Sequence, residues 1–283
     1  MTRFFAWMFS LASLGAIFGL GLFAAVLWSY GRDLPDHESL AAYEPAVISR
    51  VYDREGRVLA EYFRERRIFA PIDEIPDVVK QAFISAEDRN FYEHAGFDAL
   101  GIASAVADFA RGQRLRGAST ITQQVMKNFL LSNERSFERK IREIILATRI
   151  EQVLSKDRIL ELYLNEIYLG ARAYGVAAAA ANYFGKPLED LSLAEAAYLA
   201  ALPKAPNNYH PTRKTAAAIA RRNWVIGQMA ENGFITPQQA QAAQAAPLSI
   251  RPRGSSDVAS ADFFVEEVRR DLMAEFGEDR VYS

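Results

Sequence analysis

The pattern of apolar and polar positions divides the chain into an apolar N-terminal run and a long region with helical periodicity. No charged residue occurs in residues 4–31, and about 20 apolar residues are enough to cross a bilayer core. Trp7 and Trp28 lie near the two ends of the run, where interfacial aromatic residues are expected. The pattern predicts a retained transmembrane helix, because the apolar part of a cleaved signal peptide is only about 7–15 residues long.

The next elements are a polar stalk and a short β-hairpin. Residues 48–63 alternate in two stretches, and the turn signal Asp53-Arg-Glu-Gly56 separates them. From Pro71 onwards the apolar spacing is helical. It predicts helices over 78–86, 97–109, 120–130, 132–154, 157–169, 174–183, 192–202, 212–232, from 236 onwards and over 261–276. The chain is therefore expected to be mainly α-helical.

Composition and charge exclude several function classes. The 283 residues are 50% hydrophobic and 24% charged, the balance of a folded protein. The chain has no cysteine, which excludes disulfides, a thiol nucleophile and a thiolate metal site. It has 3 scattered histidines, so a histidine-rich zinc site is not expected. A net charge of −2 gives no general attraction for nucleic acid, and we predict no nucleic-acid partner.

One segment is nevertheless basic. Residues 111–158 hold eleven Lys or Arg against five Asp or Glu, a local balance of 11 − 5 = +6. Arg135, Arg139 and Glu143 are spaced to share one helical stripe, with Lys140 beside them. Composition alone fits a solvated helix face equally well. The spacing favours a cationic groove for a pyrophosphate, with or without a divalent metal such as Mg²⁺ or Mn²⁺.

A second candidate is the pair Glu87-Asp88, which follows an apolar helix. A carboxylate desolvated at such a position has a raised pKa and can act as a general base. The commoner interpretation of such a pair is a helix cap or a solvated turn. His94 is likewise more often structural than catalytic. From the residues alone, the chain is an anchored helical protein with a carboxylate loop and a phosphate-binding groove.

Four ordered motifs resemble the family 51 peptidoglycan glycosyltransferases, which are the glycan-polymerising domains of class A penicillin-binding proteins and the monofunctional transglycosylases. The motifs are Ser85-Ala-Glu-Asp-Arg-Asn-Phe-Tyr-Glu-His-Ala-Gly-Phe-Asp98, Gly117-Ala-Ser-Thr-Ile-Thr-Gln-Gln124, Arg139-Lys-Ile-Arg-Glu143 and Arg158-Ile-Leu-Glu-Leu-Tyr-Leu-Asn165. The resemblance runs from about residue 48 to about residue 247. It implies a lysozyme-like helical head and a smaller membrane-apposed jaw, in which the helix over 97–109 would lie.

The resemblance also implies a role for each matching residue. Glu87 would deprotonate the 4-hydroxyl of the acceptor sugar, and Glu143 would be the second acidic residue, positioning its region or holding a divalent cation. The substrate-binding residues would be Asp88, Phe91, His94, Ser119, Thr120, Gln123, Gln124, Lys127, Arg135, Arg139 and Lys140. No organic cofactor is implied, and no metal ligand is assigned. The substrates would be lipid II and the lipid-linked growing glycan, and the resemblance implies sensitivity to moenomycin-type inhibitors.

Together these inferences predict four regions. Residues 1–31 form a short cytoplasmic tail and the anchor, and 32–70 form the stalk and hairpin. Residues 71–250 form the glycosyltransferase domain on the outer, periplasmic side of the cytoplasmic membrane, and 251–283 begin a connection to a transpeptidase domain, whose Ser-x-x-Lys and Lys-Thr-Gly motifs do not occur here. Cell-wall synthesis regulators are further expected partners. The alternatives are a glycan-cleaving lysozyme-like enzyme, which has no use for a basic pyrophosphate stripe, and a membrane-tethered scaffold with a dead site.

Overall fold

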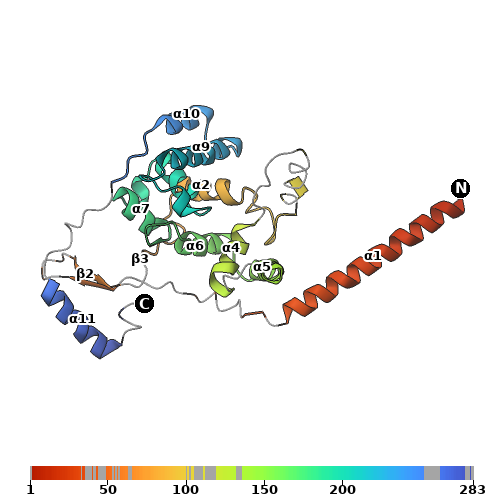
Figure 1. The fold of residues 1–283 in the computed structure, drawn as a ribbon, viewed down its shortest axis with the longest axis horizontal. Coiled ribbons are helices and arrows are strands. Elements are labelled where there is room, and N and C mark those ends of the chain that lie inside the picture. The colour runs from red at the N-terminus through yellow and green to blue at the C-terminus, as the bar shows by residue number, and fades with distance from the viewer. Residues whose placement is uncertain are drawn as a thin grey trace.

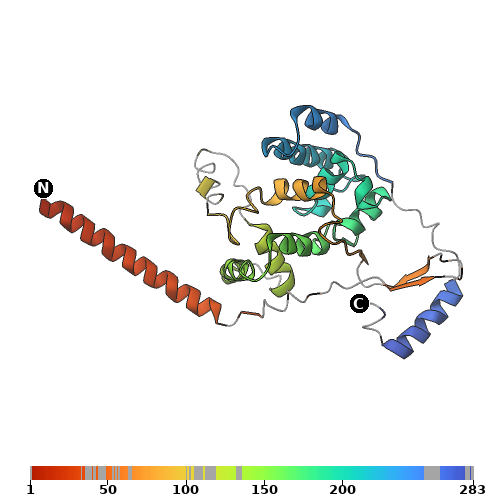
Figure 2. The ribbon, with the colours of Figure 1, turned by 180° about the vertical axis from the view of Figure 1, so that it is seen from behind.

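The computed structural model describes residues 2–32, 34–35, 40, 43, 49–52, 54, 56, 58–62, 66–99, 101, 103–104, 111, 119–131, 136–251, 262–277 and 281. Helices make up most of this part of the chain, and the described strands are short (Figures 1 and 2). This confirms the prediction of a mainly α-helical protein.

The first element is the helix α1 (Thr2–Gly31), which extends away from the helical domain in both views. The helix itself was predicted. No helix built from the described residues combines the length and the hydropathy needed to cross a bilayer. Membrane insertion of α1 therefore stays a prediction from the sequence.

The predicted hairpin is present as an antiparallel pair, β1 (Ser49–Tyr52) and β2 (Val58–Tyr62). Its register shifts at one irregularity, between Val51 and Tyr52. A second, parallel pair joins β3 (Arg66–Arg67) to β4 (Ala173–Tyr174) and ties the start of the helical domain to its middle.

One layer of the helical core consists of α2 (Asp77–Glu87), α8 (Leu193–Ala201) and α9 (Thr215–Glu231), which pack on one another. The side chain of Phe83 on α2 is fully buried, because the apolar stripe of this helix faces α8 and α9. The carboxyl end of α2 therefore points into the domain interior, where Glu87 ends the helix.

A second layer contains α4 (Ile121–Leu130), α5 (Phe137–Ile150) and α6 (Lys156–Glu166), with α4 packed against both of the others. The remaining helices are α7 (Val176–Phe184), α10 (Pro237–Ala245) and α11 (Asp262–Phe276), with the short 3-10 turns η2 (Leu188–Asp190) and η3 (Pro206–Asn208). α10 covers α9, as Figure 1 shows at the upper edge of the domain.

Several helix starts are fixed by side-chain caps that the sequence predicted. Thr120 caps α4 by accepting from the Gln123 N–H at 3.2 Å, and Ser192 forms a capping box with Glu195 at the start of α8. The predicted start of α5, another helix with a side-chain cap, needs correction. α5 begins at Phe137 and not at residue 132, because the Ser136 hydroxyl caps it by accepting from the Arg139 N–H.

Two predictions concern residues that lie largely outside the described part of the chain. The helix predicted over 97–109, and with it the jaw, lies largely outside the described residues. Arg135 also lies outside them, one position before the residue that caps α5. Of the predicted cationic stripe, Arg139, Lys140 and Glu143 are among the described residues.

Candidate active site

Glu87 is the last residue of α2, and its carboxylate meets one amide from α4. The Nε2 of Gln124 donates a hydrogen bond to Glu87 Oε2 at 2.7 Å. Burial raises the pKa of Glu87 above its ordinary value, and the neighbouring charge of Asp88 adds to this. The Gln124 hydrogen bond and the positive charges of Arg221 and Lys204 lower this pKa, but they do not offset the burial. Such a carboxylate is suited to accept a proton.

Arg221 and Lys204 were not identified from the sequence as site residues. Arg221 lies on α9, with its guanidinium 3.8 Å above the ring of Trp224, and its buried Nε finds no hydrogen-bond partner among the described residues. Burial lowers the pKa of Arg221, whereas the charge of Glu87 raises it. Lys204 is exposed in the turn after α8. Helical periodicity alone could not show that either cation faces Glu87.

The next residue, Arg222, has a different role. It is 1% exposed and donates to the backbone carbonyls of Gln244 and Ala246 at 3.0 and 2.8 Å. These contacts hold the end of α10 against α9. The two adjacent arginines therefore point to different parts of the molecule, one to the carboxylate and one to a helix end.

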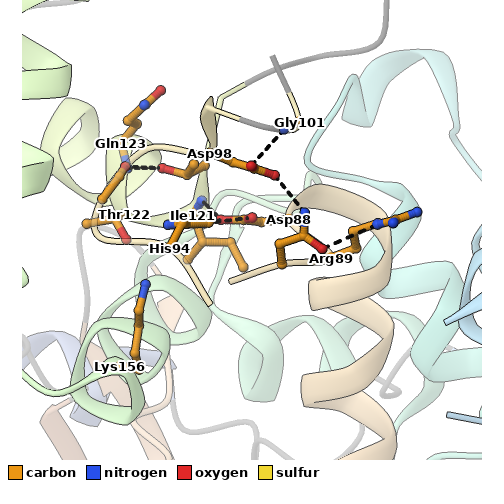
Figure 3. A network of polar contacts seen from close by, with 12 residues as sticks. Asp88, Arg89, His94, Asp98, Gly101, Ile121, Thr122, Gln123 and Lys156 are labelled. Atoms are coloured by element: carbon orange, nitrogen blue, oxygen red, sulfur yellow. Dashed lines mark hydrogen bonds and ion pairs between the residues drawn. The ribbon is translucent and has the colours of Figure 1, made fainter. Parts of the chain in front are cut away.

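Asp88 anchors the loop that follows α2 (Figure 3). Its carboxylate accepts from the Ile121 N–H at 2.9 Å and lies 3.0 Å from His94 Nε2. Both side chains are nearly inaccessible, at 3% for Asp88 and 8% for His94. A carboxylate at the N-terminus of α4 is stabilised by the unpaired N–H groups there. Asp88 and His94 thus fix α4, which carries Gln124, relative to Glu87.

A further set of contacts closes the same loop from the side of α6. Phe91 is fully buried, and the Lys156 ammonium lies 4.5 Å from the centre of its ring. Lys156 also pairs with Glu151 at 2.7 Å, and the Thr122 hydroxyl donates to the same carboxylate. The predicted site residue Phe91 therefore packs inside the loop that follows α2, and no contact with Glu87 is shown among the described residues.

The second candidate carboxylate, Glu143, is 4% exposed and lies between two cations of its own helix. Arg139 Nη1 is 2.9 Å from Oε1, and Lys140 Nζ is 3.0 Å from Oε2. Lys140 also donates to the Ser119 hydroxyl and to Gln123 Oε1, at 2.7 and 2.8 Å. The cluster Ser119, Gln123, Arg139, Lys140 and Glu143, here called the cationic cluster, joins α4 to α5.

The predicted site residues therefore fall into separate groups. Gln124 meets Glu87, whereas Ser119, Gln123, Arg139 and Lys140 surround Glu143. The Thr120 hydroxyl donates to the Gly96 carbonyl at 2.7 Å and so supports the loop behind Glu87. Lys127 is partly buried in the last turn of α4.

The described residues do not offer a metal site. They contain no group of three His, Cys, Asp or Glu side chains placed to hold an ion. Glu143, the one carboxylate considered for a divalent cation, is neutralised by Arg139 and Lys140. Metal binding needs several anionic or neutral ligands converging on one point, and Glu143 does not have such companions among the described residues.

Comparison with known proteins identifies relatives of this arrangement. Residues 55–230 match the family described as Transglycosylase. Penicillin-binding protein 1A of Rickettsia bellii is 47% identical over 94% of this chain, and that of Neisseria flavescens is 47% identical over 93%. The chain spans about a third of the length of these relatives (34% and 33%). The chain is also similar to a crystal structure of penicillin-binding protein 1A from Haemophilus influenzae, with 27% identity and a TM-score of 0.49. The match covers 85% of this chain and 26% of the crystallised chain.

Proposed function

The chain belongs to the transglycosylase family, and from this premise we propose that it is a peptidoglycan glycosyltransferase that joins lipid II units into β-1,4 glycan strands. The observation that carries the proposal is the environment of Glu87. Burial raises the pKa of this carboxyl, one amide orients it, and two cations face it. This combination supports a general base for a sugar hydroxyl.

In the proposed reaction, Glu87 removes the proton from the 4-hydroxyl of the acceptor sugar. The oxygen attacks the anomeric carbon of the donor MurNAc as the bond to the lipid pyrophosphate breaks. The product has an inverted, β configuration, because attack and departure take place in line on opposite faces. Undecaprenyl pyrophosphate leaves with the bonding electron pair, and Glu87 keeps the proton.

The cationic cluster supports the second requirement, stabilisation of the pyrophosphate leaving group. In the structure, Lys140 uses its ammonium on three oxygen acceptors, so its position is fixed before substrate binds. Arg139 has a buried Nε with no hydrogen-bond partner among the described residues. We assign the first contact with the pyrophosphate to Arg139, and Lys140 would exchange one of its present acceptors for a phosphate oxygen. Lys127 and Arg135 would complete the site.

We further infer that the enzyme works at the outer face of the cytoplasmic membrane, attached through α1. The uncharged run over 4–31 supports this, and so does the exposure of large apolar side chains along α1. Those side chains are Phe4, Trp7, Phe9, Leu14, Ile17, Phe18 and Trp28, each at least 66% exposed. The substrates would be lipid II and the lipid-linked growing strand, both delivered by the bilayer.

The test is polymerisation of fluorescent lipid II by the wild type and by Glu87→Gln. We expect polymer from the wild type and a loss of about 10²- to 10⁴-fold in the variant, the usual contribution of a general base. Glu189→Gln, which neutralises an exposed glutamate on η2, is the matched control and should polymerise normally. Equal polymer from wild type and Glu87→Gln would refute the assignment, and cleavage of finished strands would favour a lysozyme-like enzyme.

A further inference from the structure

The end of α1 lies beside α5, the helix that carries the cationic cluster. α1 packs on α5, and Arg149 Nη2 donates to the Gly31 carbonyl at 3.3 Å. Figures 1 and 2 both place the Gly31 end of α1 next to α5. The guanidinium of Arg149 is thus held where the apolar helix ends, which is the level of lipid headgroups if α1 lies in a membrane.

Two other arginines belong to the same surface. Arg32 follows α1, is exposed, and lies 4.4 Å over the ring of Trp28. Arg142 precedes Arg149 by two helical turns, so the two share one side of α5, about 10 Å apart. The Arg142 Nε is buried without a hydrogen-bond partner among the described residues. We call Arg32, Arg142 and Arg149 the anchor arginines.

The anchor arginines differ from the cationic cluster in their counter-charges. Glu143 neutralises Arg139 and Lys140, whereas none of the anchor arginines has a carboxylate partner in the part of the chain that the structure describes. An arginine beside a tryptophan at the end of an apolar helix is typical of a membrane interface. Arginine donors also match the geometry of phosphate oxygens.

We propose that the anchor arginines bind the phosphate headgroups of anionic phospholipids in the bulk membrane. This inference rests on the proposed attachment of α1. Binding there would fix the height and rotation of α5 above the bilayer, and therefore the position of Arg139 and Lys140 relative to a lipid-linked pyrophosphate. Arg149 lies on the side of α5 opposite Lys140. Arg142 is one turn from Arg139 on the same face, so the headgroup site borders the substrate groove, and variants of Arg139 and Lys140 are needed to tell the two apart.

The experiment uses the full chain in vesicles of equal parts phosphatidylglycerol and phosphatidylcholine, with one of the two lipids dibrominated. Bromine quenches tryptophan at contact, and Trp7→Phe with Trp224→Phe leaves Trp28 as the single reporter among the three tryptophans. We expect brominated phosphatidylglycerol to quench Trp28 more strongly than brominated phosphatidylcholine. The preference should weaken as salt rises from 0.1 to about 0.5 M, because salt screens surface charge.

Arg142→Gln with Arg149→Gln should reduce the preference for phosphatidylglycerol roughly tenfold, in line with the usual effect of basic residues near an anionic surface. The double lysine variant at the same positions should retain most of it, which separates charge from a purely structural role of the arginines. Arg172→Gln with Arg213→Gln removes two exposed charges elsewhere and should leave it unchanged.

The inference would be overturned by no preference in the wild type, by an unchanged preference in the double glutamine variant, or by an equal loss in the control. A loss caused by Arg139→Gln with Lys140→Gln instead would place headgroup binding in the substrate groove and also overturn it. No lipid II is present, so the outcome is independent of the polymerisation assay. A chain that polymerises lipid II without preferring phosphatidylglycerol would refute only the headgroup site. A chain that prefers phosphatidylglycerol but does not polymerise lipid II would refute only the proposed glycosyl transfer.

Discussion

The two carboxylates predicted to act in the site, Glu87 and Glu143, have opposite surroundings. Glu87 accepts one hydrogen bond from a neutral amide, and its two cationic neighbours act from a distance that leaves burial as the largest influence on its pKa. Glu143 touches two cations directly, at 2.9 and 3.0 Å. We infer from this difference that incomplete charge compensation suits Glu87 to act as the base, whereas complete compensation suits Glu143 to position its neighbours.

After Glu87→Gln, the largest effect on polymerisation is expected from removing a cation of the cationic cluster. Lys140→Met should lower the polymerisation rate about 10²- to 10³-fold, the usual loss when one preorganised donor to a developing charge is removed. Initial rates with fluorescent lipid II measure it.

Lys186→Met provides a matched control for that experiment. Lys186 is also in an ion pair, with Glu195, and its side chain is 38% exposed against 39% for Lys140. The control should polymerise normally. A comparable loss in both variants would mean that Lys140 acts only through stability.

Glu143→Gln should mainly destabilise the fold, because it leaves two cations without their shared carboxylate. We expect a cost of about 1–3 kcal/mol, less than for a fully buried pair because Lys140 is partly solvated. Thermal unfolding gives this as a fall in Tm. In a double-mutant cycle, Arg139→Met should cost less in the Glu143→Gln background than in the wild type. Strictly additive costs would contradict the pairing.

A smaller effect is expected from Ser136→Ala, which removes the cap of α5. The Ser136 hydroxyl accepts from the Arg139 N–H at 3.0 Å, and losing such a cap costs about 1 kcal/mol. Urea unfolding measures the loss. The pH dependence of polymerisation should stay that of the wild type, since α5 does not carry the base, and a shifted profile would show that the two carboxylate sites are coupled.

The smallest expected effect is on stability in Glu87→Gln. A carboxyl whose pKa is raised on folding favours the folded state below its unfolded pKa, and this contribution is lost as pH rises through the folded pKa. The wild type therefore carries a cost at neutral pH that glutamine does not. The variant should have the higher Tm at pH 7, and the difference should shrink toward pH 4. A lower Tm at pH 7 would mean that Glu87 is ion-paired in the folded protein.

What the sequence could predict depends on how far apart the interacting residues are. The caps of α4 and α8 were predictable, because Thr120 and Ser192 bind N–H groups three residues away. The start of α5 was misplaced, because the serine at 132 and the serine at 136 are both plausible caps and spacing does not choose between them.

The site itself was predicted unevenly for the same reason. Motif resemblance predicted roles for Glu87, Gln124 and the residues of the cationic cluster, which three local segments supply, and the structure shows the contacts among them. It did not identify Arg221, because Arg221 and Arg222 look equivalent in sequence and only packing decides which one faces the carboxylate. It also did not show that Asp88 and His94 bind each other and the start of α4, since that contact joins two loops.

The central claim is that Glu87 is the base and that its environment sets its pKa. The most direct test is the pH dependence of kcat/KM for lipid II polymerisation by the wild type and by Gln124→Leu. We expect activity to fall on the acidic side at a pH above the ordinary pKa of glutamate, about 4.3. In Gln124→Leu this fall should move to still higher pH, because the hydrogen bond that lowers the pKa of Glu87 is lost. An acidic limb that lies at the ordinary value, or that does not move in Gln124→Leu, would contradict the account.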